Sequence, residues 1–70
     1  MKTYTLHFKN PGYNVNMYLG GFNTMREAYE EIKNVQPRII TVYMAMMMEN
    51  IALSGYYEIQ EERYDKGMLN

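Results

Sequence analysis

The residues that could carry chemistry are few in this chain of 70 residues. It has no cysteine and a single histidine, His7, so thiolate zinc sites and imidazole-rich metal sites are both excluded. As a general base, His7 needs a nucleophile or an orienting carboxylate nearby, whereas its own segment offers only Thr3, Thr5 and Lys9. We therefore interpret His7 as a solvent-facing strand residue, which leaves open a pH-dependent role at an interface.

Three other patterns resemble binding sites without having the required spacing. The acidic residues of the C-terminal part lack the alternating spacing of a calcium loop: they are Glu58, Glu61, Glu62 and Asp65. Gly20 and Gly21 precede a helix signal but match neither dinucleotide-binding nor Walker A spacing. Met44, Met46 and Met48 offer soft thioethers for Cu(I), but packing in the core or at an adaptable binding surface is the favoured explanation for them. We predict a protein that is not an enzyme and has no cofactor or metal.

Charge and hydropathy narrow the class of protein further. The net charge is -1, so the chain as a whole has no general electrostatic attraction to a phosphate backbone. The charge is unevenly distributed, with +2 on residues 1–38 and -3 on residues 39–70. The N-terminus lacks the apolar core of a secretory signal, and no apolar run approaches the roughly 18 residues that cross a bilayer. We expect a cytoplasmic protein with no membrane contact.

Alternation of apolar and polar residues predicts two strands at the start of the chain. Residues 3–9 place Tyr4, Leu6 and Phe8 on one side, and residues 13–19 alternate in the same way. Between them, Asn-Pro-Gly at 10–12 is a turn signal, because proline fixes φ and glycine accepts positive φ. The two segments predict a β-hairpin.

A helix is predicted next, with a signal at each end. Thr24 followed by Glu27 forms a capping box, with Asn23 as a rival N-cap. Helical spacing then gives one narrow apolar stripe: Met25, Ala28, Tyr29, Ile32 and Val35. Pro37 disfavours helical geometry at the residue before it, so we predict that the helix ends there.

The remaining segments predict two more strands. Residues 38–47 are apolar on both faces of a strand, and residues 55–64 alternate again, with 65–70 expected to be a frayed tail. The predicted fold is one α+β domain over residues 1–70: a two-layer β-β-α-β-β sandwich with one helix on a four-stranded, mainly antiparallel sheet.

One helix covers only one face of such a sheet, so the second face is predicted to bind a partner protein. That face would gather Tyr18, Ile39, Tyr43, Met47 and Tyr56, more large apolar side chains than a monomer usually exposes. We expect a homodimer or a complex with another protein, because tyrosine and methionine are enriched at interfaces. The predicted partner-binding residues are Tyr18, Tyr43, Met47, Tyr56, Glu58 and Glu62.

Residues 20–32, GGFNTMREAYEEI, resemble a strand-to-helix junction found in many small β-β-α-β domains. These include the arm-type DNA-binding domains of integrases and short phage-encoded inhibitors of host proteins, such as the phage inhibitor of bacterial RNA polymerase. The resemblance covers about residues 4–43 and transfers no functional residue. It implies a phage or mobile-element protein that inhibits a host protein, since the sheet lacks the basic residues of the integrase domains.

The sequence thus predicts a small protein-protein interaction module. Its acidic last strand would face a basic host surface, such as that of a nucleic-acid-binding protein, an RNA polymerase or a defence nuclease. The alternative is a small nucleic-acid-binding accessory domain whose sheet tyrosines stack on bases. Nucleic acid is the less favoured partner, because that use needs a positive groove beside the tyrosines and the last strand is acidic.

Overall fold

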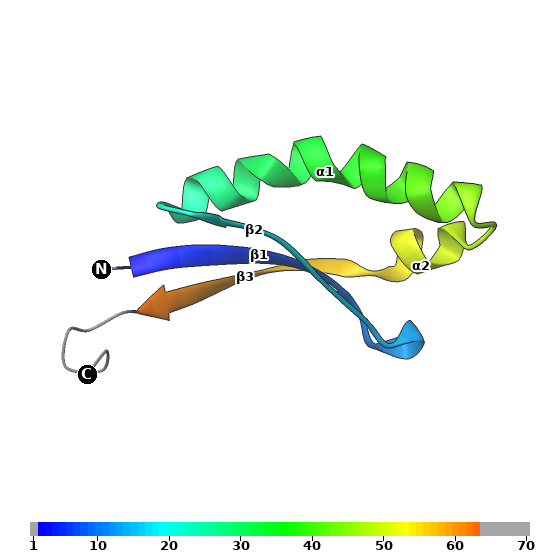
Figure 1. Cartoon of the computed structure of the whole chain (residues 1–70), viewed down its shortest axis with the longest axis horizontal. Coiled ribbons are helices and arrows are strands. Elements are labelled where there is room, and N and C mark those ends of the chain that lie inside the picture. The colour runs from blue at the N-terminus through cyan, green and yellow to red at the C-terminus, as the bar shows by residue number, and fades with distance from the viewer. Residues whose placement is uncertain (1, 64–70) are drawn as a thin grey trace.

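The computed structural model describes residues 2–63 of the chain and shows an α+β fold (Figure 1). The elements are β1 (Lys2–Asn10), a 3-10 turn (Pro11–Tyr13), β2 (Val15–Phe22), α1 (Met25–Ala45), α2 (Glu49–Ser54) and β3 (Tyr56–Arg63). The frayed tail predicted at 65–70 lies outside the described residues. One main helix and an antiparallel sheet are therefore confirmed as the fold class.

The sheet has three strands in the order β2-β1-β3, with β1 in the centre. Leu6 pairs with Gly20 of β2 on one side and with Ile59 of β3 on the other, and both ladders are antiparallel. The predicted hairpin is confirmed: Asn14 adopts a left-handed conformation with φ of 58°, and its N–H donates to the Pro11 carbonyl at 3.1 Å. A register shift between Leu6 and His7 marks a bulge in the β1–β2 pairing.

The core lies between one face of this sheet and α1, which runs along that face (Figure 1). Leu6 and Phe8 of β1 are fully buried there. The helices add the other large members of the cluster: Val35, Ile39, Tyr43 and Ile51. The strict alternation of β1 therefore selects which face meets the helix, as the sequence predicted.

The strand predicted at 38–47 is wrong, because α1 continues through Pro37 to Ala45. Ile39 and Tyr43 follow Val35 at helical spacing, so one turn after another reaches the core. An interior proline costs a helix about 3 kcal/mol, whereas burying two such side chains contributes about 1.5–3 kcal/mol each. Burial outweighs the local penalty, and the fourth strand of the predicted sandwich is absent from residues 2–63.

The beginning of α1 agrees with the predicted capping box. Thr24 is the N-cap in an extended conformation, and its hydroxyl accepts the Glu27 N–H at 3.1 Å. The same hydroxyl donates to the Glu27 carboxylate at 3.0 Å. The first of these bonds satisfies one unpaired N–H in the first turn of the helix, and the second joins the two side chains.

A buried amide attaches α2 to the central strand. Asn10 is only 5% exposed, and its Nδ2 donates to the Ile51 carbonyl at 2.8 Å and to the Ser54 hydroxyl at 2.9 Å. Gly55 follows directly, where an added Cβ would overlap the ring of Phe8. The chain therefore passes from α2 into β3 in close contact with the core.

We predict that Asn10→Ala lowers the free energy of unfolding by about 1–3 kcal/mol, because it leaves the buried Ile51 carbonyl without this donor. Urea unfolding monitored by circular dichroism measures the change. Asn16→Ala on the exposed side of β2 is the control and should alter stability by less than about 0.5 kcal/mol. Equal effects of the two substitutions would contradict the attachment of α2 by Asn10.

We predict that Pro37→Ala raises the free energy of unfolding by about 2 kcal/mol. Alanine restores a helical N–H and removes the steric clash of the proline ring. A smaller effect opposes this gain, because the unfolded chain has more conformational entropy without proline. Thermal unfolding and the far-ultraviolet helical signal are the measurements, with the neighbouring Gln36→Ala as control. A destabilised Pro37→Ala variant would contradict a helix that continues through residue 37.

Candidate protein-binding surface

The six predicted partner-binding residues do not form one surface. Tyr18, Tyr56, Glu58 and Glu62 lie on the sheet face opposite the helices, in register with the polar side chains of β1. Tyr43 is a core residue, 9% exposed, with its ring 6.5 Å from that of Phe8. Met47 lies beyond the end of α1 and is 94% exposed. Tyr43 and Met47 are absent from the predicted sheet face because residues 38–45 are helical and not a strand.

The open face of the sheet is polar, contrary to the prediction of an apolar one. β1 contributes Thr3, Thr5, His7 and Lys9 to its centre. Of the large apolar residues predicted there, only the two edge tyrosines remain: Tyr18 is 62% exposed and Tyr56 is 48% exposed. Ile39 is buried in the core together with Tyr43. The open face therefore does not require a covering chain to hide apolar surface.

Two charged side chains of this face, Lys9 and Glu58, are paired with each other. Lys9 forms an ion pair with Glu58, and Gln60 donates to the same carboxylate at 2.7 Å. These hydrogen bonds, that from Lys9 first, lower the pKa of the Glu58 carboxyl below its ordinary value. The bond to Glu58 likewise raises the pKa of Lys9. The other ion pair of the sheet, Lys2 with Glu61 at 3.3 Å, lies on the opposite face, the one that carries Leu6 and Phe8.

His7 packs within this polar face. Its Nε2 lies 3.1 Å from the Thr5 hydroxyl, and its ring meets that of Tyr18 edge-on at 5.6 Å. Its Nδ1 is buried and has no hydrogen-bond partner among residues 2–63. No carboxylate lies within hydrogen-bond distance of the His7 ring in this part of the chain.

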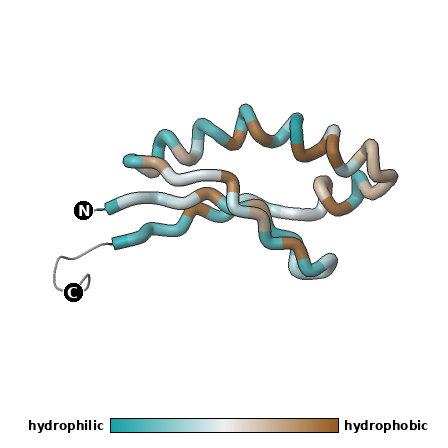
Figure 2. The backbone as a smooth tube through the Cα atoms, viewed as in Figure 1, coloured by the Kyte–Doolittle hydropathy of each residue, from teal (hydrophilic) through white to brown (hydrophobic). Residues whose placement is uncertain are grey.

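A second exposed surface lies at the C-terminal end of α1. Four methionines project there, which we call the methionine cluster: Met44, Met46, Met47 and Met48. Each is about half exposed or more, from 47% for Met48 to 94% for Met47. Figure 2 shows a mainly hydrophilic first half of α1 and a mainly hydrophobic second half that leads into this cluster. Glu49 is the one charged residue between positions 39 and 57.

Backbone hydrogen bonds fix the conformation of the methionine cluster. The Met48 N–H donates to the Tyr43 carbonyl at 2.7 Å, and the Met47 N–H donates to the Met44 carbonyl at 2.9 Å. This pair of bonds is a Schellman motif, whose left-handed residue is usually glycine. Here that residue is Met47, with φ of 59°. A long side chain is thus held in a conformation that costs it about 1–2 kcal/mol relative to right-handed geometry.

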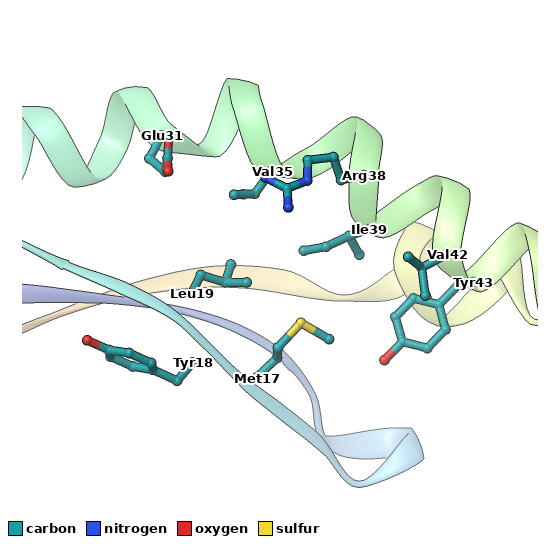
Figure 3. Close-up of a pocket in the computed structure, with 9 residues that line it drawn as sticks. All are labelled: Met17, Tyr18, Leu19, Glu31, Val35, Arg38, Ile39, Val42 and Tyr43. Carbon is teal, nitrogen blue, oxygen red and sulfur yellow. The ribbon is translucent and has the colours of Figure 1, made fainter.

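A third feature is a groove of about 300 Å³ between α1 and β2. Figure 3 shows α1 side chains above it, among them Val35, Ile39 and Val42, and Met17 and Leu19 of β2 below. Glu31 and Arg38 of α1 also line it (Figure 3). The groove was not predicted from the sequence. Its signal was present as two opposite charges seven residues apart on one helix flank.

No other kind of site is assigned in the described part of the chain. Among residues 2–63, no three histidine, cysteine or acidic side chains are placed to share a metal ion. Within that range no helix is long and apolar enough to span a membrane. No protein-family model, curated protein or solved structure matches the chain. The functional assignment of the candidate surfaces therefore rests on the geometry of this chain alone.

We predict that the pKa of the Glu58 carboxyl lies below the ordinary value of a glutamate and that Lys9→Met moves it upward, since the main cause of the shift is removed. A carboxyl pKa lowered by folding stabilises the fold above the unfolded value, and this contribution is lost as pH falls through the folded pKa. Carboxyl chemical shifts followed by NMR from pH 7 to pH 2 measure it. Lys2→Met is the matched control and should leave Glu58 unchanged, because Lys2 pairs with Glu61.

Proposed function

We propose that the chain is a non-enzymatic protein-binding module and that the methionine cluster is its docking surface. The observation that carries the proposal is Met47, which is 94% exposed in a left-handed position where glycine would be unstrained. Its side chain contributes almost nothing to the core and strains the backbone. Contact with another protein gives such a side chain a role that the isolated fold does not.

The chemistry of the methionine cluster supports an apolar partner surface. Methionine side chains are flexible and polarizable, so they adapt to different apolar shapes, and they are common on binding surfaces for amphipathic segments. Glu49 is the single charge in the surrounding stretch, which leaves little basis for recognition by charge. The proposed partner therefore presents apolar side chains, as an amphipathic helix does.

The more specific prediction of a basic host target has less support from the charges of the fold. It depends on the acidic β3, where Glu58 pairs with Lys9 and Glu61 pairs with Lys2. These pairs reduce the negative charge available to a basic surface. Inhibition of a host nucleic-acid-binding protein by a phage-encoded chain stays a prediction from the resemblance at residues 20–32.

We predict that Met47→Gly stabilises the protein by about 1 kcal/mol and weakens partner binding at the same time. Glycine relieves the positive φ, whereas the loss of the side chain removes the central contact of the methionine cluster. Thermal unfolding gives the first effect. The second is measured by capture of proteins from a bacterial lysate on the immobilised variant, quantified by mass spectrometry.

Met25→Ala is the control for this experiment, because Met25 is exposed at the other end of α1. The expected result is a set of proteins retained by the wild type and by Met25→Ala but lost with Met47→Gly. Equal retention by all three would overturn the methionine cluster as the docking surface. Salt-sensitive retention of nucleic acid alone would favour a nucleic-acid-binding domain instead.

A further inference from the structure

The two edges of the sheet differ sharply in charge. β3 carries Glu58, Glu61, Glu62 and Arg63, and charges of this kind discourage pairing with another strand. β2, VNMYLGGF, has no charged residue. Its outer edge therefore presents backbone donors and acceptors without the usual protection, apart from the bulge opposite Leu6 and His7.

The apolar groove lies directly beside this unprotected edge. Met17 and Leu19 of β2 form its floor, and Val35, Ile39 and Val42 of α1 form its wall (Figure 3). Val42 is 53% exposed even though it lines the groove. A molecule that pairs with β2 would therefore also cover apolar side chains of α1, as in binding by strand addition.

The charges of the groove indicate which molecule this is. Glu31 and Arg38 lie on the α1 flank that lines the groove, seven residues or about 10.5 Å apart along the helix. Neither belongs to an ion pair within residues 2–63, where the pairs are Lys2–Glu61 and Lys9–Glu58. The Glu31 carboxylate accepts only the exposed Asn34 amide, at 2.8 Å, in the same part of the chain. Opposite charges in this order are complementary to an antiparallel copy of themselves.

We propose that the occupant is a second copy of the chain, bound through the β2 edge and the Glu31–Arg38 flank of α1. The two β2 strands pair antiparallel, and the two α1 helices lie antiparallel across the same two-fold axis. With that axis between residues 34 and 35, Glu31 of each copy faces Arg38 of the other, so symmetry supplies the ion pair twice. This proposal does not rest on the methionine cluster, which an antiparallel arrangement leaves at the two far ends of the helix pair.

Charge reversal tests the pairing of α1 with its copy. Glu31→Arg alone and Arg38→Glu alone each place like charges opposite one another. We therefore expect each single variant to dimerise at least about tenfold more weakly than the wild type, as measured by sedimentation at low salt. An equimolar mixture of the two variants should regain the dimer, because every facing pair is then opposite in charge. The double variant Glu31→Arg, Arg38→Glu should regain it as well.

The results that overturn the proposal are equally specific. A monomeric wild type at high concentration contradicts it, and so does a mixture no more dimeric than its two components. Single variants that dimerise as tightly as the wild type would place the interface elsewhere. Circular dichroism and thermal unfolding confirm that each variant is folded, since both positions lie on the helix surface.

A matched pair of tyrosines tests the sheet edge separately. Tyr18 of β2 and Tyr56 of β3 are exposed on the same face of the sheet but belong to opposite edges. We expect Tyr18→Lys to abolish the dimer, since a lysine on an edge strand opposes pairing, and Tyr56→Lys to leave it intact. Equal behaviour of the two variants would contradict the β2 edge. We expect Met47→Gly to dimerise normally, so that failure of the proposed dimer can be distinguished from failure of partner binding at the methionine cluster.

Discussion

The packing of Leu6 and Phe8 against α1 is the interaction on which the rest of the structure depends. These are the largest fully buried side chains among residues 2–63, and both come from the central strand. Ile39 and Tyr43 can cover them only if α1 remains helical past Pro37. The helix therefore tolerates the local cost of an interior proline, because the core is too small to lose two large side chains.

That long helix determines where apolar surface remains exposed. Because α1 continues to Ala45, its second half carries hydrophobic residues on more faces than the sheet can cover. The excess appears in two places, the methionine cluster beyond the helix end and the groove above β2. The opposite face of the sheet, where the sequence predicted the excess, is instead filled by threonine, lysine and glutamate side chains.

Most of the fold was predictable because its signals are local. The strands at 3–9, 13–19 and 55–64 follow from alternation, and Thr24 and Glu27 locate the start of the helix. The error at 38–47 arose because Pro37 and a run of β-branched residues and methionine both favour an extended chain locally. What decided the outcome was burial of Ile39 and Tyr43 against Phe8, a contact between segments that local patterns cannot weigh. The misplaced candidate residues follow from that one error, since Tyr43 and Met47 were assigned to a strand.

The exposed apolar side chains lie in two places of different chemistry, and these support two separate proposals for interaction. The groove is bordered by an uncharged strand edge and by a self-complementary pair, Glu31 and Arg38, so its recognition depends on backbone pairing and on charge order. The methionine cluster has neither property, and its side chains adapt by rotation about unbranched bonds. The first surface therefore suits one partner of fixed geometry, and the second suits partners that differ in shape. Because the groove and the methionine cluster lie at different positions along α1, the dimer proposed at the groove would leave the methionine cluster of each copy exposed.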